Sequence, residues 1–506
     1  MVDLSLSLEK LNASLTTIRD DFLRHLKENN SIVRIYTHLD ADGLSSGAIL
    51  GKSFLREEIP FQITTLRQLE KEEIVKISKN ITNNESFIIF SDFGSGQYLE
   101  LQRELINKKD FSSFLILDHH LPQKISDKND INLIKQIFHE THGWHINPYF
   151  FGIDGSQEVS GAGMCYYFAK CLNKNNIDLS PIAIVGAIGD IQNQGPNKSF
   201  QGLNTLILED AINNKLVEVK NDLNFSSIKP INEAIAYSND INLPGLTKDV
   251  NKTLIFLQSL GILIENLDGT IKSLHELNQE EKQKISSAII EYSSLKLGIE
   301  PNIITKKLII NRYLLTNEVK GSELHDASEF SNLLNACGRN NFASVGIAIG
   351  MGDRNRSYKK SQEILRDYKK TLSKSLSWIH DNHKIQQKEY IQFFFGEDVI
   401  PESIIGTISS MLIFDKYKGV DKSKPIFGLA ERKDENVYKV SGRAHEKIVK
   451  KGINLSKAIR DACDLSGLDV LGGGHPPAAG TKIPLDKVDI FLDNCNTVIQ
   501  AQLQSD

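Results

Sequence analysis

The hydrophobic positions of this chain follow two different spacings. In residues 1–30, leucine, isoleucine and phenylalanine recur every three or four positions, which is the period of one face of a helix. From Ile32 to about Asp190, short apolar runs alternate with amphipathic stretches. This alternation is typical of βαβ units, in which the strands form a parallel sheet and helices cover it. We therefore predict an N-terminal helix followed by an α/β domain.

Acidic residues follow four of the apolar runs. The runs are residues 32–36, 87–90, 114–117 and 182–185. Runs rich in Ile, Val and Phe are typical of buried parallel strands, although the last run fits a buried helix equally well. Because ligands of open α/β sheets bind beyond the carboxyl ends of the strands, we expect the following polar residues to meet in one crevice. These polar segments are His38-Leu39-Asp40-Ala41-Asp42-Gly43, Ser91-Asp92, Asp118-His119-His120 and Gly189-Asp190.

The polar segments together have the composition of a site for two divalent cations. Mixed carboxylate and imidazole ligands favour Mn²⁺ and leave Mg²⁺ possible. Two such ions, about 3.5–4 Å apart, can stabilise the attacking and leaving oxygens of a phosphodiester and lower the pKa of water. Each segment alone has an ordinary explanation, because Asp-x-Asp-Gly is usually a turn and a lone Asp often caps a helix. Four segments in this order favour the metal site.

The same segments resemble the motifs of the DHH phosphoesterase superfamily in order and separation. The resemblance implies two sets of metal ligands, His38, Asp40 and Asp92 for one ion and Asp42, Asp92, His119 and Asp190 for the other. Asp92 would bridge the two ions and take part in catalysis. His120 would face the substrate phosphate, and Asp118 would orient a ligand from behind. All motif positions are intact here, unlike in the catalytically inactive helicase subunits of the superfamily.

A glycine-rich segment near the C-terminus is the second informative pattern. Consecutive glycines at residues 472–474 let the backbone approach a phosphate closely, although a tight turn explains glycines alone equally well. The segment resembles the Gly-Gly-Gly-His loop of the DHHA1 substrate-binding domain. Residues 440–444 resemble the Ser-Arg segment of the same domain, with glycine standing before the arginine. The substrate-binding residues so implied are Ser441, Arg443, Gly472, Gly473, Gly474 and His475, to which we add Arg339 and, as further candidates, Arg354 and Arg356.

The pattern changes after the first α/β region. Residues 193–243 are predicted to be mostly helical, and residues 245–307 show the spacing of a helical connector or small insertion. Further on we predict a helix that ends at Gly338, a strand over residues 345–349 and a long helix over residues 366–379.

Two further stretches, residues 147–163 and 325–339, resemble the archaeal RecJ-like group, which includes the GINS-associated nuclease. The expected fold is α/β: an N-terminal DHH domain with a mainly parallel sheet flanked by helices, a helical connector and a C-terminal mixed α/β DHHA1 domain. The predicted domains are a DHH catalytic domain over 1–243, a helical connector or insertion over 244–307, a middle mixed region over 308–385 linked to the C-terminal domain, and DHHA1 over 386–506.

Composition and charge exclude only a few classes of protein. The 506 residues are 40% hydrophobic and 24% charged, which is ordinary for a soluble protein, and the formal charge of −5 gives no general sign of nucleic-acid binding. No apolar run approaches the roughly 20 residues that span a bilayer, and we identify no secretory signal. The five cysteines lack Cys-x-x-Cys spacing, which argues against structural zinc. We expect a cytoplasmic protein without a membrane partner.

The resemblance implies a manganese-dependent exonuclease that acts on single-stranded DNA or RNA in a cleft between the DHH and DHHA1 domains. One alternative is a phosphoesterase for dinucleotides or short oligoribonucleotides, although such relatives are generally shorter chains. The other is a replication scaffold that binds GINS and the replicative helicase, with secondary nuclease activity. The intact ligand set argues against a purely structural role.

Overall fold

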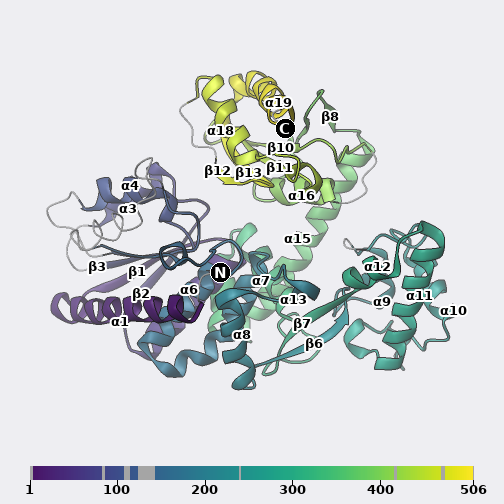
Figure 1. Cartoon of the computed structure of the whole chain (residues 1–506), viewed down its shortest axis with the longest axis horizontal. Coiled ribbons are helices and arrows are strands. Elements are labelled where there is room, and N and C mark those ends of the chain that lie inside the picture. The colour runs from purple at the N-terminus through teal and green to yellow at the C-terminus, as the bar shows by residue number, and fades with distance from the viewer. Residues whose placement is uncertain are drawn as a thin grey trace. The chain divides into compact units, whose positions relative to one another are not determined.

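The computed structural model describes residues 4–81, 86–106, 114–123, 143–238, 241–414, 419–468 and 473–504. The chain divides into two compact units, Met1–Ile364 and Leu365–Asp506, whose elements are labelled in Figure 1. The first unit contains a parallel five-stranded sheet covered by helices, and the second contains a mixed sheet. The expected α/β fold class is therefore confirmed.

The sheet of the first unit has the strand order β2-β1-β3-β4-β5, and all its neighbouring strands are parallel. Its strands are β1 (Ile32–His38), β2 (Phe61–Leu66), β3 (Ser86–Ser91), β4 (Phe114–Leu117) and β5 (Gly143–Ile146). Every residue of β3 and β4 is buried, as expected for central parallel strands. Because the strands run parallel, His38, Asp92 and Asp118 come to the same edge of the sheet.

Helices α1 (Leu4–Asn29), α2 (Ala41–Arg56) and α6 (Gly161–Leu172) pack against the sheet and against one another. The ring of Phe22 on α1 lies 5.6 Å from that of Phe54, 4.8 Å from that of Phe87 and 5.7 Å from that of Phe168. This aromatic cluster joins α1 to α2, β3 and α6, and the predicted N-terminal helix is confirmed. Smaller helices of this part are α3 (Lys71–Asn80), α4 (Tyr98–Leu101) and α8 (Gly202–Asn213).

Two apolar runs that fit strands in the sequence are helices. The run before Asp190 forms α7 (Ser180–Gly189), so the helical alternative holds there. The strand predicted over residues 345–349 is wrong, because these residues lie in α14 (Ala343–Met351). Both helices have small residues in close contact with α2, and both are buried on most sides. Such burial removes the polar face that reveals a helical period in the sequence.

A two-stranded antiparallel ribbon, β6 (Val217–Leu223) and β7 (Ile309–Leu315), leads into and out of a helical region. Strand β6 interrupts a stretch that we predicted as mostly helical. The helices α9 (Ile231–Ala236), α10 (Val250–Ser259), α11 (Gln279–Leu297) and α12 (Pro301–Leu308) pack round a core of their own (Figure 1). The helical character agrees with the expected connector, whereas its bounds of 244–307 stay a prediction.

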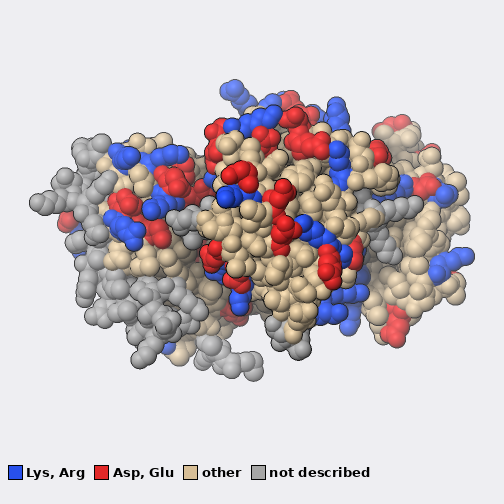
Figure 2. All heavy atoms as spheres, turned by 90° about the horizontal axis from the view of Figure 1, so that it is seen from above, with Lys and Arg blue, Asp and Glu red and all other residues tan. Residues whose placement is uncertain are grey.

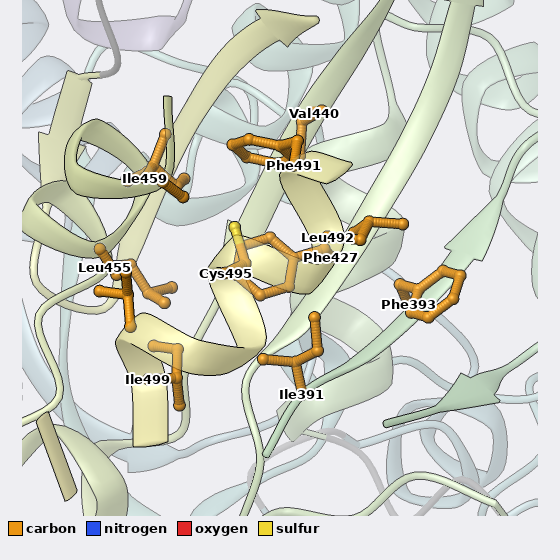
Figure 3. Close-up of a cluster of buried hydrophobic side chains, with 14 of the residues drawn as sticks. Ile391, Phe393, Phe427, Val440, Leu455, Ile459, Phe491, Leu492, Cys495 and Ile499 are labelled. Carbon is orange, nitrogen blue, oxygen red and sulfur yellow. The ribbon is translucent and has the colours of Figure 1, made fainter. Parts of the chain in front are cut away.

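The second unit contains a six-stranded sheet in the order β12-β13-β11-β10-β9-β8. Its strands are β8 (Gln386–Gln387), β9 (Gln392–Phe395), β10 (Ile426–Arg432), β11 (Val437–Arg443), β12 (Gly473–His475) and β13 (Ala478–Pro484), and its helices are α16 (Ile405–Phe414), α17 (Glu446–Val449), α18 (Leu455–Leu465) and α19 (Val488–Gln504). Figure 3 shows side chains from β9, β10, β11, α18 and α19 that point toward one another around Phe491. This buried cluster is the core of the second unit.

One long helix completes the set of elements. Helix α15 (Arg356–Asp381) contains the predicted helix over residues 366–379 and extends it by ten residues toward the N-terminus. In the described part of the chain, no helix is long and apolar enough to cross a membrane. On the face drawn in Figure 2, basic and acidic residues are interspersed.

Candidate metal centre

The first set of expected ligands lies where β1 ends and α2 begins. His38 Nδ1 lies 2.9 Å from Asp40 Oδ2 and 3.8 Å from Asp92 Oδ2. His38 Nε2 lies 3.0 Å from the carbonyl oxygen of Arg67, so it donates a hydrogen bond there. Nδ1 is then the ring nitrogen left for a cation. One ligand atom from each of the three residues lies within 4.8 Å of the others.

The second set surrounds His119. Its Nε2 lies 3.2 Å from Asp92 Oδ1, 3.7 Å from Asp42 Oδ2 and 3.7 Å from Asp190 Oδ2. His119 Nδ1 donates to the carbonyl oxygen of Gly155 at 2.7 Å. The buried Nε2 atom has no hydrogen-bond partner among the described residues. A buried polar nitrogen without a partner, facing three carboxylates, fits a bound cation.

The ionisation of these groups supports the same conclusion. Burial, and then the carboxylates Asp42 and Asp40, raise the pKa of Asp92 well above its usual range. Burial lowers the pKa of His119, but Asp190 and the other carboxylates around it outweigh that effect and raise it to about 9. Without a metal ion, the cluster therefore takes up protons to reduce its negative charge. Divalent cations would supply that positive charge instead, so the donor set fits metal ions.

Asp92, which is expected in both ligand sets, has an unusual backbone conformation. Its φ of 62° lies in the left-handed region, which is uncommon for a residue other than glycine. Its N–H donates to the carbonyl oxygen of Leu117 at 3.0 Å. A Cβ at Gly161 would lie 2.6 Å from Asp92 Oδ1, so the first residue of α6 must be glycine. This packing holds one carboxylate oxygen toward each ligand set, which is the arrangement that a bridging ligand needs.

The start of α6 also holds Asp42. Gly161 N donates to Asp42 Oδ2 at 2.7 Å, and Ala162 N donates to Oδ1 at 3.0 Å. N–H groups at a helix N-terminus favour a charged carboxylate. Gly161 and Ala162 therefore position a candidate ligand, a function that their sequence alone did not reveal.

Asp118 lies behind the ligands and contacts His120. Asp118 Oδ1 accepts from His120 Nδ1 and from His119 N, each at 2.8 Å, and Oδ2 accepts from Ser95 N at 2.9 Å. Burial and His119 lower the pKa of His120, but Asp118 outweighs them and raises it to about 9. The His120 side chain is 38% exposed. A protonated and accessible imidazole of this kind can bind a phosphate oxygen.

Gln192 is a site residue that the sequence did not reveal. It is 1% exposed, and its Nε2 donates to Asp190 Oδ2 at 2.8 Å and to the Gly155 carbonyl oxygen at 3.0 Å. Asn204 Nδ2 donates to Gln192 Oε1 at 2.7 Å. Gln192 therefore ties Asp190 to the carbonyl that orients His119. The one signal in the sequence was its place two residues after Asp190.

A second buried network supports Asp118 and His120 from the other side. Asn147 Nδ2 donates to Ser95 Oγ and to the His120 carbonyl oxygen, each at 2.8 Å. Ser95 Oγ also forms a hydrogen bond with His145 Nε2 at 2.7 Å. Burial lowers the pKa of His145 to about 3, so this histidine is neutral.

The expected substrate-binding residues are placed in both units. In the first unit, Arg339 ends α13 (Ala327–Arg339), and its charge contributes to the lowered pKa of Asp40. The guanidinium of Arg354 pairs with the Glu318 carboxylate through two nitrogens. Arg356 is the first residue of α15. Both residues stay predictions as substrate contacts.

In the second unit, Ser441 and Arg443 lie on β11, where Arg443 Nε donates to Ser410 Oγ at 2.8 Å. The expected glycine loop is partly a strand, because residues 473–475 form β12 and pair with β13. Gly474 has φ 138°, and a Cβ there would lie 2.4 Å from the Ala478 carbonyl oxygen. Residues 473–475 are exposed, and Gly472 lies outside the described residues.

The chain is similar to known proteins in its domains, its sequence and its fold. The family model of the DHH-CID domain matches residues 226–309, and that of the DHHA1 domain matches residues 392–501. The uncharacterized protein MJ0831 of Methanocaldococcus jannaschii is 34% identical over 499 residues, which cover 98% of this chain and 99% of that protein. Similar solved structures are exonuclease RecJ bound to manganese (TM-score 0.54, 15% identity, 96% of this chain and 94% of that chain) and CDC45 from Entamoeba histolytica (TM-score 0.63, 12% identity, 97% and 99%).

The chain belongs to the DHH family. The two family models confirm the expected DHH and DHHA1 domains, and the chain shares the fold of RecJ and CDC45. The match to the DHH-CID model covers the region that the sequence pattern predicted only as a helical connector or small insertion. The TM-scores show that these solved structures share the fold, although their sequence identities are low.

Proposed function

We propose that this RecJ-like DHH protein is a metal-dependent exonuclease that hydrolyses phosphodiester bonds in single-stranded DNA or RNA. The observations that carry the proposal are two groups of candidate ligands, one of His38, Asp40 and Asp92 and one of Asp42, His119 and Asp190. Asp92 Oδ1 also lies 3.2 Å from His119 Nε2. Family membership and the manganese bound to RecJ support Mn²⁺ as the cofactor, with Mg²⁺ as the second choice.

The proposed ligands are His38, Asp40 and Asp92 for one ion and Asp42, Asp92, His119 and Asp190 for the other. When bound, the two ions would stabilise the charge on the attacking and leaving oxygens and lower the pKa of water. His120, protonated through Asp118, would donate a hydrogen bond to a phosphate oxygen and stabilise the charge that develops there. Gln192 and the start of α6 would keep the ligands in place during turnover.

The nucleic-acid backbone would be held by donors outside the ligand sets. Arg443 offers a planar guanidinium that can bind a phosphate through two nitrogens, and Ser441 lies two residues away on the same strand. The exposed strand β12 would add His475 and its glycine backbone, and Arg339 would contribute from the first unit. We propose these contacts for the phosphate backbone, which is common to DNA and RNA.

The direct test is digestion of end-labelled single-stranded DNA and RNA oligonucleotides of one sequence with Mn²⁺. A ladder of products from one end is expected, with Asp92→Ala inactive and still folded by circular dichroism. Cleavage of only the shortest oligonucleotides would replace this proposal with the small-substrate phosphoesterase. Near-normal turnover by Asp92→Ala would contradict the bridging role of that residue.

A GINS-bound role at the replication fork is a second candidate. The observation that favours it is the resemblance of residues 147–163 and 325–339 to the group that includes the GINS-associated nuclease. A pull-down with GINS and helicase from the same organism tests it, with an unrelated protein of similar charge as the control. Failure to bind either partner would contradict this role.

A further inference from the structure

Helix α13 contacts the loop that carries two candidate metal ligands. Asn335 Oδ1 accepts a hydrogen bond from Ala41 N at 3.1 Å. Ala41 is the first residue of α2, and the N–H groups of a first helical turn have no partner within their own helix. Asp40 caps the same turn by accepting from Gly43 N at 3.0 Å. Asn335 therefore completes, from a distant part of the sequence, the cap that Asp40 begins.

A glycine marks the second contact between α13 and this loop. A Cβ at Gly338 would lie 1.6 Å from the carbonyl oxygen of Leu39, so no other residue fits without moving the loop or the helix. Helix α13 was predicted to end at Gly338, and it ends one residue later, at Arg339. From the side of α7, a Cβ at Gly189 would lie 2.6 Å from Ala41 Cβ. Helices α7 and α13 thus both pack closely against residues 39–42, and Figure 1 shows the two helices side by side.

The other end of α13 is anchored as well. Its N-cap Asp326 is 1% exposed and forms an ion pair with Arg312 of β7. Arg312 also donates to the carbonyl oxygen of Leu223 at 2.7 Å. Ser226 Oγ donates to Glu329 Oε1 at 2.5 Å. These contacts fix the start of α13 to the residues where the DHH-CID region begins, so the helix is held at both ends.

We propose that Asn335 is a positioning residue for the metal centre. By holding Ala41 N, it fixes the backbone between Asp40 and Asp42, whose carboxylates belong to different ligand sets. Loss of this hydrogen bond lets the start of α2 shift, so that both ligand sets lose their geometry together. The inference rests on the proposed two-metal site, and it gives a function to Asn335, which the proposed reaction does not use.

The test measures Mn²⁺ binding to the full-length protein without nucleic acid, from the electron paramagnetic resonance signal of free Mn²⁺. Asn335→Ala is expected to weaken binding about tenfold, the lower end of the range for residues that support metal ligands. Asn332→Ala is the matched control, because Asn332 is exposed on the same helix and loses the same atoms. Asn335→Asp keeps an oxygen that can accept from Ala41 N, and it should recover most of the affinity.

The proposal is overturned if Asn335→Ala and Asn332→Ala both bind Mn²⁺ as tightly as the parent protein. It is also overturned if both variants lose the same affinity, because that result indicates a weakened helix and not a lost contact. If Asn335→Ala does not fold, Mn²⁺ binding is measured on Asn335→Asp, and tenfold weaker binding by that variant would overturn the proposal. If the parent protein binds Mn²⁺ but cleaves no strand, that result contradicts the proposed nuclease activity and not the role of Asn335.

Discussion

At the scale of single residues, the protonation of His120 decides what that side chain can do. Asp118 holds the imidazole and raises its pKa to about 9, so the ring is positively charged at neutral pH. We expect His120→Ala to lower the single-turnover cleavage rate by about 100-fold, because one donor to a developing charge contributes about that much. Mn²⁺ affinity should change by less than about threefold. A large loss of Mn²⁺ binding would show instead that His120 is a ligand.

His145 gives a prediction about pH. Burial lowers its pKa to about 3 in the folded protein, whereas an unfolded histidine has a pKa of about 6.5. Below pH 6.5 the unfolded chain therefore binds a proton that the folded protein does not bind. The free energy of unfolding falls as the pH falls from 6.5 toward 3.

We expect the parent to lose up to about 1.4 kcal/mol of unfolding free energy per pH unit more than His145→Gln does over this range. Urea unfolding at pH 7, 6 and 5 measures the difference in slope. His383→Gln, which removes an exposed histidine, is the control. Parallel slopes for the parent and His145→Gln would contradict a buried neutral histidine.

The residue scale also shows what the sequence could predict. The charged candidates His38, Asp92 and His119 were found because each follows an apolar run, and few residue types bind divalent cations. Gln192 and Asn335 were missed because an amide acquires its role only when the fold brings an acceptor or an N–H group to it. The sequence contains no local pattern for such a long-range contact.

At the scale of elements, the buried ion pair between Asp326 and Arg312 joins the start of α13 to β7. Removal of one partner leaves the other charge buried and uncompensated. We expect Asp326→Ala to lower the unfolding free energy by about 3–5 kcal/mol, measured by urea unfolding. Asp249→Ala is the matched control, because Asp249 also caps a helix and pairs with Lys252 but is partly exposed. A similar loss in both variants would contradict the importance of burial.

Buried strands and helices with one buried face were predictable, whereas helices buried on most sides were not. The strands β1, β3 and β4 follow from short runs of apolar residues, and the amphipathic helices α1 and α15 follow from the spacing of theirs. The runs in α7 and α14 lack a polar face, so length and spacing do not separate a helix from a strand. Strand β12 was hidden for another reason, because glycines have no side chains from which a strand pattern could be recognised.

At the scale of the whole molecule, all candidate ligands lie in the first unit, and this makes the effect of Mn²⁺ local. A ligand that binds only the folded state stabilises what it binds by an amount that grows with its concentration. In hydrogen–deuterium exchange, saturating Mn²⁺ should therefore increase protection at the ends of β1, β3 and β4 and at the start of α2. The sheet of the second unit, whose core surrounds Phe491, should exchange as it does without metal. Asp92→Ala, which removes the carboxylate shared by both ligand sets, should abolish the difference. If protection rises equally in both units, Mn²⁺ is stabilising the molecule by some route other than the proposed centre.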